Sequence, residues 1–271
     1  MLLANNNAVI YGAGGSLGSA VAKALAAQGA QVFVTGRTLQ PVQTVADEII
    51  AAGGKAIAAV VDAFDKEAIN AHLEKMKQQA GTVDISFNAA GVDVKQNIPL
   101  VDLTVAEFVT PVTLTMQTRF LTATAAAKIM IQQGCGVILS LTATPGGIGY
   151  PYTGGFAPAC CAVECFSQNL ASEVGIYGVR VVNIRSGGSP DSRVFINAIE
   201  NNPGVMNEVL HKMTADTMLK QLPLMEDIAN AAVFLSSPMA AKITGVTVDV
   251  TAGTTAALNY RVQTVNRAVG P

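Results

Sequence analysis

Short apolar runs alternate with longer helical segments along almost the whole 271-residue chain. Apolar runs of about five residues are typical of strands buried on both faces of a parallel sheet. Strands are expected at residues 7–11, 31–35, 56–61, 83–87, 136–141, 179–184 and 246–250. Helices are expected at residues 17–29, 40–52, 66–80, 104–133, 156–175 and 225–236. This alternation predicts an α/β fold built on a doubly wound parallel sheet of the Rossmann type.

The alternation continues without an internal repeat, low-complexity tract or linker, so residues 1–271 are expected to form a single domain. Pro111 is expected to break or kink the long helix at 104–133. Residues 186–222 are expected to be largely irregular. The tail at 259–271 follows the last predicted strand, and it is either a loose end, a subunit contact or a flap over the site.

Composition excludes several classes of function. The chain has 17 basic and 19 acidic residues, a net charge of −2, so no basic surface for nucleic acid or for anionic lipid is expected. No apolar stretch is long enough to cross a membrane. The first residues carry no basic region of a secretory signal, and the four cysteines form no CxxC pair. We therefore expect a cytoplasmic protein without a metal site or disulfide framework.

The first predicted strand leads into the sequence GAGGSLG at residues 12–18, and a helix begins there. Glycines allow a tight turn and a close approach of the backbone to a pyrophosphate, while the start of the helix offers unpaired N–H groups. An ordinary strand–helix turn also favours glycine, but the position between strand and helix favours nucleotide binding. The residues expected to contact the dinucleotide here are Gly12, Gly14, Gly15, Ser16, Leu17 and Gly18.

The end of the second predicted strand bears on the choice of cofactor. An acidic side chain here would bind a ribose 2′-hydroxyl and repel a 2′-phosphate. The chain instead has Gly36 followed by Arg37, and a guanidinium can bind phosphate through two hydrogen bonds. This predicts a preference for NADP(H) over NAD(H).

Several motifs in order resemble those of the short-chain dehydrogenase/reductase family over nearly the whole chain. The glycine turn resembles the family's TGxxxGxG, with Tyr11 in place of Thr and Ser16 in place of the middle Gly. Residues 88–91 (NAAG) resemble the NNAG element, and residues 183–187 (NIRSG) resemble the NxxPG turn. Residues 227–229, 243–245 and 252–253 resemble the family's C-terminal pattern.

The resemblance implies a seven-stranded sheet, a nicotinamide cofactor, a small-molecule substrate and a homodimer or homotetramer. It implies a substrate lid at about residues 188–222, which contain several methionines, and a contact of the adenine with the aspartate after the third strand. The additional cofactor-binding residues that it implies are Asp62, Ala63, Asn88, Ala89, Gly91, Gly187 and Ser189.

The resemblance fails at the residues that carry the family's chemistry, which are Asn, Ser and a Tyr-xxx-Lys pair on one helix. Alignment of the chain places Phe156 in the Tyr position and Cys160 in the Lys position. Thr115 falls in the Asn position and Thr142 in the Ser position. No lysine occurs between Lys128 and Lys212, so a displaced motif is excluded. Phenylalanine has no proton to give, and the family's acid–base step is therefore expected to be impaired.

Other side chains can be considered as replacements. Thr142 can polarise a carbonyl, or it is a strand-end residue; Tyr152, or its neighbour Tyr150, can donate a hydrogen bond, or it lies at a rim or interface. The cysteines are interpreted as small buried thiols. His72 is expected to be solvated, and His211 is a weak candidate for contact with the substrate.

Two functions are consistent with these residues. The first is an NADP(H)-dependent oxidoreductase with a non-standard active site that reduces a carbonyl, an imine or an activated enone. An iminium ion is already cationic, and an enolate can take its proton from water, so neither needs a strong acid from the protein. The alternative is a catalytically inactive scaffold or partner subunit that binds the cofactor.

Overall fold

The computed structural model describes residues 1–257, and the tail predicted at 259–271 lies outside the described residues. Seven parallel strands form one sheet in the order β3-β2-β1-β4-β5-β6-β7. The chain order of the strands reverses between β1 and β4, which is the place where such sheets open a crevice. The strands are β1 Asn7–Tyr11, β2 Gln31–Gly36, β3 Lys55–Val60, β4 Ile85–Asn88, β5 Gly136–Ala143, β6 Val179–Ser186 and β7 Val246–Val250.

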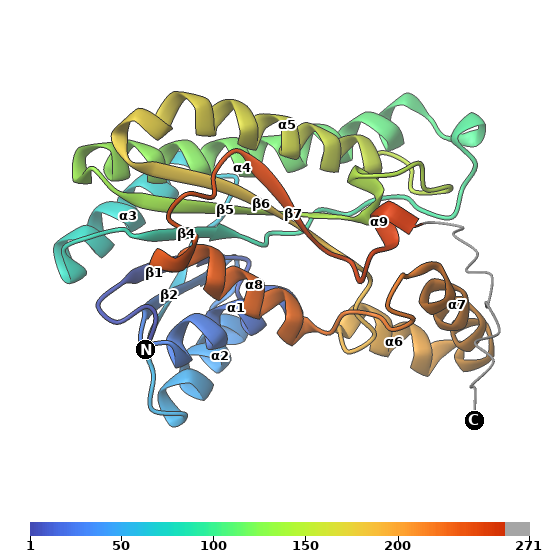
Figure 1. Cartoon of the computed structure of the whole chain (residues 1–271), viewed down its shortest axis with the longest axis horizontal. Helices are drawn as coiled ribbons and strands as arrows, with labels where there is room; N and C mark the ends of the chain where they lie inside the picture. Colours follow the sequence, from blue (N-terminus) through green and yellow to red (C-terminus); the bar gives the residue numbers. More distant parts are fainter. Residues whose placement is uncertain (258–271) are drawn as a thin grey trace, which may run out of the picture.

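Helices cover both faces of the sheet. Figure 1 shows α3, α4 and α5 on one face and α1, α2 and α8 on the other, with α6 and α7 beyond one end of the sheet. The main helices are α1 Ser16–Ala27, α2 Leu39–Ala51, α3 Lys66–Ala80, α4 Val105–Gln133, α5 Phe156–Val174, α6 Arg193–Asn201, α7 Pro203–Asp216 and α8 Met225–Ser236. The short helix α9 is Thr254–Ala257. The predicted doubly wound α/β fold is confirmed.

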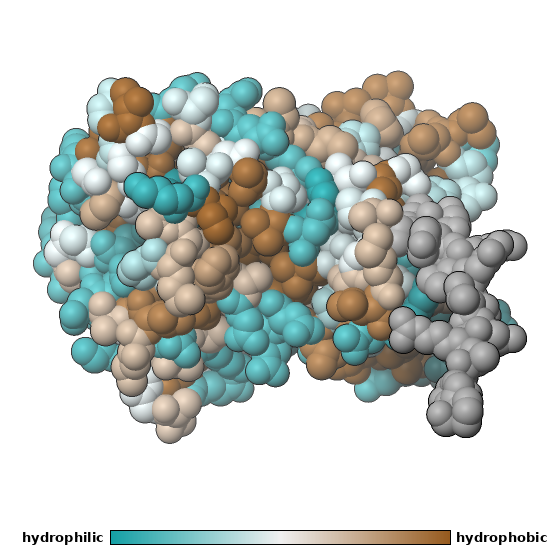
Figure 2. Space-filling model, in the orientation of Figure 1, coloured by the Kyte–Doolittle hydropathy of each residue, from teal (hydrophilic) through white to brown (hydrophobic). Residues whose placement is uncertain are grey.

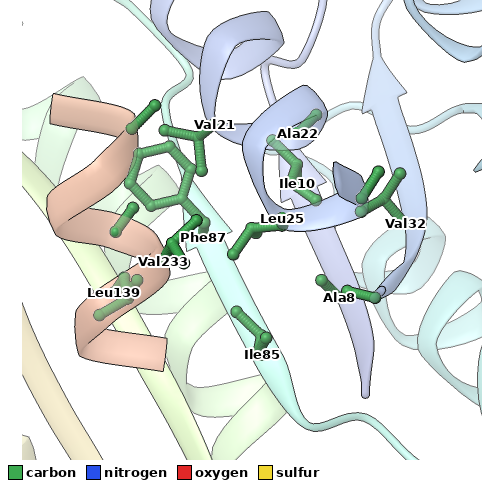
Figure 3. Close-up of a cluster of buried hydrophobic side chains, with 14 of the residues drawn as sticks. Ala8, Ile10, Val21, Ala22, Leu25, Val32, Ile85, Phe87, Leu139 and Val233 are labelled. Carbon is green, nitrogen blue, oxygen red and sulfur yellow. The ribbon is translucent and has the colours of Figure 1, made fainter. Parts of the chain in front are cut away.

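The strands bury both faces in two apolar clusters. Along β1, Ala8 and Ile10 face the cluster under α1, α2 and α8, while Val9 and Tyr11 face the cluster under α3, α4 and α5. Figure 3 shows part of the first cluster, in which Leu25 lies among side chains of the sheet. This two-sided burial explains why the strands read as continuous apolar runs.

The expected break in the helix at Pro111 and the expected irregular segment at 186–222 are both wrong, while a kink at Pro111 stays a prediction. Helix α4 runs without a break through Pro111, because a proline near the helix start removes only one hydrogen bond and Thr104 caps the helix with a reciprocal bond to Glu107. The segment expected to be irregular contains α6 and α7. Ser192 caps α6 by accepting a hydrogen bond from the N–H of Phe195, and α7 begins at a proline.

Burial differs from expectation at three side chains, His72, Cys161 and Cys165. His72 is not solvated, since its Nδ1 is buried and its ring packs edge-on against Phe33 with centroids 6.2 Å apart. Cys160 is buried as expected, but Cys161 and Cys165 are exposed.

β7 forms one edge of the sheet, and hydrophobic surface gathers on the face of the molecule where β7 lies (Figure 2). Val246 on this strand is 43% exposed.

Within the described residues, none of the helices has the length and hydropathy needed to span a membrane.

Candidate active site

The glycine turn between β1 and α1 is built on a backbone that only glycine fits. Gly12 has a φ of +74°, and a Cβ there would stand 2.7 Å from the N atom of Ala90 on the neighbouring strand end. A Cβ on Gly18 would collide with the carbonyl oxygen of Gly12. The turn therefore packs tightly between the first turn of α1 and the residues that follow β4.

A cavity of about 210 Å³ opens at the carboxyl ends of β1 to β4. It brings together seven of the predicted cofactor-binding residues, namely Gly12, Gly15, Arg37, Asp62, Ala63, Ala89 and Gly91. Asp62 accepts a hydrogen bond of 3.0 Å from the N–H of Phe64 through Oδ1. The exposed guanidinium of Arg37 and the carboxylate of Asp62 thus lie on the rim of one cleft whose walls contain glycines.

Other predicted cofactor-binding residues lie outside this cleft. The backbone of Gly14 approaches α2, where a Cβ would stand 2.7 Å from Cβ of Pro41. Ser16 accepts a hydrogen bond of 3.0 Å from the N–H of Arg193, which joins the glycine turn to the start of α6. Leu17, Gly187 and Ser189 line a second, larger cavity.

Asn88 is buried and does not line either cavity. Its Oδ1 accepts hydrogen bonds from the N–H of Ala90 at 2.9 Å and from Nη1 of Arg119 at 2.6 Å. Its Nδ2 donates to Oγ1 of Thr122 at 2.8 Å. Asn88 therefore fixes the turn after β4 from behind and presents no group to the cleft.

The second cavity has a volume of about 600 Å³ and is mainly apolar. Its walls come from the end of β5, the loop that leads to α5, the end of β6, and α6, α7 and α8. Phe156 lines it, and so do Met206 and Met213 of α7. Within the described lining, Tyr150 and Asp216 are the titratable side chains, and Asp216 lies 3.6 Å from Nζ of Lys212.

Thr142 does not line the cavity, and its predicted contact with a substrate carbonyl does not fit its geometry. Its Oγ1 donates to Oε1 of Glu164 at 2.8 Å and accepts from Nδ2 of Asn183 at 2.7 Å. Alternation along β5 turns Thr142 toward α5, while its neighbours Leu141 and Ala143 line the cavity.

The two tyrosines of the loop before α5 differ in position. Tyr152, the predicted replacement acid, is 56% exposed, has a φ of +61° and is not part of the cavity lining. Tyr150 lines the cavity. The structure therefore places Tyr150, and not Tyr152, in the lining of the larger cavity.

The remaining sequence candidates lie away from the cavity lining. Thr115 accepts a hydrogen bond of 3.1 Å from Thr118 through its carbonyl oxygen. His211 is exposed on α7. Burial raises the pKa of the Cys160 thiol to about 11, which keeps the sulfur neutral. No cluster of metal-ligating side chains is found within residues 1–257.

Sequence reasoning missed Arg119, which is 7% exposed and joins α4 to the turn after β4. A signal was available in the sequence. Arg119 stands on a helix with few charges, and it shares a helical face with Thr122, Ala123 and Ala126, all of which are buried. A lone cation at core spacing indicates a buried functional or structural role.

The geometry fits a dinucleotide. At Gly91 a Cβ would meet nothing within 4 Å, so open space lies beside the cleft wall. The N-cap of α1 is Gly15, which has no side chain to occupy the first N–H groups of the helix. The Oγ of Ser189 is buried without a hydrogen-bond partner among the described residues. Ser189 lines the same cavity as Leu17, and an unpartnered buried hydroxyl there is what a bound ligand would satisfy.

Comparison with known proteins agrees with this geometry. Residues 12–255 match the family model described as Enoyl-(Acyl carrier protein) reductase. Levodione reductase of Leifsonia aquatica is 28% identical over 257 residues, which cover 92% of this chain and 94% of the relative. The 7alpha-hydroxysteroid dehydrogenase of Escherichia coli K12 is 29% identical over 252 residues, covering 93% and 95%.

Solved structures give the same result. The crystal structure of levodione reductase matches with a TM-score of 0.86 at 26% identity, covering 94% of this chain and 99% of the other. A short-chain type dehydrogenase/reductase from Mycobacterium marinum matches with a TM-score of 0.81 at 26% identity, covering 94% and 96%. The chain therefore belongs to the short-chain dehydrogenase/reductase family, a family of oxidoreductases that use nicotinamide cofactors.

Proposed function

We propose that this protein is an NADP(H)-dependent oxidoreductase that reduces an uncharged, largely apolar carbonyl compound, imine or activated enone. The observation that carries the proposal is that two cavities open at the carboxyl ends of the strands. One has glycine walls with Arg37 and Asp62 on its rim, and the other is a large apolar chamber. Ligands of open α/β sheets bind at the carboxyl ends of the strands.

The preference for NADP(H) rests on Arg37. Its guanidinium lines the cleft at the end of β2, where the 2′-position of an adenosine ribose is held in folds of this kind. The residue before it, Gly36, offers no carboxylate to repel a phosphate. Asp62 and Ala63 would border the adenine, and Gly12, Gly15 and Gly91 would allow the backbone to approach the phosphates.

The substrate class follows from the larger cavity. Its volume lies within the usual range for small-molecule sites, about 300–1,000 Å³. No lysine, arginine or histidine is among its described lining residues, so nothing there would neutralise a carboxylate or phosphate of a substrate. Methionines on α7 can adapt to differently shaped apolar molecules. A relative named for a hydroxysteroid is consistent with an apolar substrate.

The proposed active site is non-standard because the side chain nearest the family's acid position, Phe156, cannot donate a proton. A bound nicotinamide would supply the hydride. Tyr150 is the described lining hydroxyl best suited to hold or protonate the substrate oxygen. Phe156 and Leu141 would exclude water from the same chamber. Residues 188–222 would act as the substrate lid, since α6 and α7 form one wall.

Turnover tests this proposal directly. Purified protein with NADPH should consume the cofactor with neutral cyclic ketones, imines or enones. It should not do so with matched substrates that carry a carboxylate. Consumption with charged substrates alone would contradict the proposed substrate class.

A second function is favoured by the hydrogen bonds of Thr142, whose hydroxyl is committed to Glu164 and Asn183. A site in which the hydroxyl of Thr142 is already engaged and Phe156 stands in the wall also suits a cofactor-binding scaffold. Binding of NADPH without consumption across the whole substrate panel would favour the scaffold over the enzyme.

A homodimer or homotetramer is part of the proposal. Phe120 on α4 is 53% exposed and its ring lies 6.0 Å from that of Phe166 on α5. An exposed aromatic side chain on α4 that packs against a half-buried one on α5 is suited to a contact between copies of the chain.

A further inference from the structure

Arg119 is a buried cation whose charge is not neutralised by any carboxylate of the described residues. Its side chain is 93% buried, as its exposed fraction of 7% implies, and it takes part in none of the ion pairs within residues 1–257. Its Nη1 donates to Oδ1 of Asn88 at 2.6 Å, to the carbonyl oxygen of Ala90 at 2.9 Å and to Oγ1 of Thr118 at 3.2 Å. Its Nε is buried without a partner among the described residues.

The nearby thiol does not balance this charge. Cys160 of α5 is close enough to Arg119 to interact electrostatically, but burial raises the pKa of the thiol to about 11. Burial lowers the pKa of Arg119 to about 10, so the guanidinium is still protonated at neutral pH. The pair therefore carries a net positive charge in the interior, which is costly unless an anion or a strong dipole compensates it.

The position of Arg119 connects it to the cofactor cleft. Two of its three acceptors belong to Asn88 and Ala90, and residues 89–91 form one wall of the smaller cavity. Cys160 lies one helical turn after Phe156, which lines the larger cavity. Arg119 thus stands behind the wall of the smaller cavity, and its neighbour Cys160 lies one helical turn from the wall of the larger one.

We propose that Arg119 is the positioning residue of the dinucleotide site: its hydrogen bonds hold the turn at 88–91 in its binding conformation, and its uncompensated charge strengthens binding of the anionic dinucleotide. This proposal rests on the proposed cofactor binding. In this chain the cation behind the turn comes from α4 and not from α5, because residue 160 of α5 is a cysteine.

The charge and the packing of Arg119 can be separated by moving the charge between helices. Arg119→Met keeps much of the volume and removes the charge, Arg119→Lys keeps the charge, and Arg119→Met with Cys160→Lys returns a cation from α5. Lys128→Met is the matched control, since Lys128 is an exposed cation on the same helix. NADPH affinity by titration calorimetry and the melting temperature without ligand are measured for each variant.

Arg119→Met should weaken NADPH binding at least about 10-fold, equivalent to about 1.4 kcal/mol. The lysine variant should recover most of the loss. The double variant returns the charge but not the hydrogen bonds to Asn88 and Ala90, so it should recover part of the loss. Lys128→Met should bind as the wild type does. Unchanged affinity in folded Arg119→Met would overturn the proposal. A folded double variant that recovers nothing would overturn its electrostatic half.

A measurement without cofactor keeps the proposal testable if Arg119→Met folds poorly. Cys160→Lys alone places a second cation beside Arg119 and should lower the melting temperature sharply, and Arg119→Met should relieve that loss. The absence of such coupling would contradict an uncompensated charge at this place. If the wild type binds neither NADPH nor NADH, the proposed function itself fails, whereas wild-type binding that the variants leave unchanged counts against Arg119 alone.

Discussion

At the scale of single residues, the direction of a side chain decides its role more than its type does. Thr142 has the hydroxyl that polarises a carbonyl in related chemistry, but it points at Glu164 and away from the cavity. The alternation of side chains along β5 predicts this direction of Thr142, since Leu139 packs on the opposite face from Ile138. Residues 141 and 143 share the side of Leu139, and they line the chamber.

Arg37 is expected to select the phosphorylated cofactor. Arg37→Ala should weaken NADPH binding about 10- to 100-fold, the usual contribution of charge-assisted hydrogen bonds, and change NADH binding little. Calorimetry with both cofactors measures the difference. An equal loss for NADPH and NADH would show that Arg37 does not contact the 2′-phosphate.

Tyr150 is expected to act on the substrate, and Tyr152 is not. With any substrate that is turned over, Tyr150→Phe should lower kcat about 100-fold, the lower range for loss of a general acid. Tyr152→Phe is the matched control, because its ring is exposed and lies outside the cavity lining. Impairment of the Tyr152 variant alone would restore the prediction made from the sequence.

At the scale of elements, helix α3 packs on the sheet and holds His72 where a charged imidazole is unfavourable. Burial, aided by Lys75, lowers the pKa of His72 to about 4 from 6.5. Its ring packs against Phe33 of β2. The native state therefore holds the imidazole neutral across the pH range in which an exposed histidine takes up a proton.

This difference makes stability depend on pH. Between about pH 6.5 and pH 4 the unfolded chain binds a proton at His72 more readily than the native chain does, so the free energy of unfolding falls as the pH falls. The loss attributable to this group is at most about 3 kcal/mol. Urea unfolding should show a shallower pH dependence for His72→Gln than for the wild type. A pH dependence of His72→Gln as steep as that of the wild type would contradict this account.

The elements differ in how far the sequence could predict them. Strands such as β1 and helices such as α3 are predicted to within a residue or two, because each buries apolar residues at a regular period. Helices α6 and α7 bury none of their residues fully, and several of their apolar residues line the larger cavity. The apolar residues of α6 nevertheless gather on one face, so the sequence carried a helical signal there that the prediction of an irregular segment missed. Helix α4 remains continuous through Pro111 because capping and packing outweigh one lost hydrogen bond.

The same limit applies to the site. The glycine turn, Arg37 and Asp62 are local features at strand ends, and parallel pairing brings them into one cleft. Arg119 is 31 residues from Asn88 in the sequence, and only the packing of α4 on β4 joins them. Such long-range contacts have no periodic signal.

At the scale of the whole molecule, the exposed Phe120 of α4, next to the half-buried Phe166 of α5, predicts self-association. Phe120→Glu should shift the protein to a smaller species in sedimentation velocity, because a charge would be buried in the contact. Val60→Glu is the control, since Val60 is a 58% exposed residue on the strand at the opposite edge from β7. A monomeric wild type, or equal effects of both substitutions, would contradict a contact at Phe120.

The central claim is that the cleft at the ends of β1 to β4 binds a phosphorylated nicotinamide dinucleotide beside an apolar substrate chamber. Titration calorimetry of the wild-type chain with NADPH and with NADH tests it most directly. The account predicts saturable heat with one NADPH bound per chain and weaker binding of NADH. The absence of binding heat with both cofactors, in either redox state and at two temperatures, would contradict it.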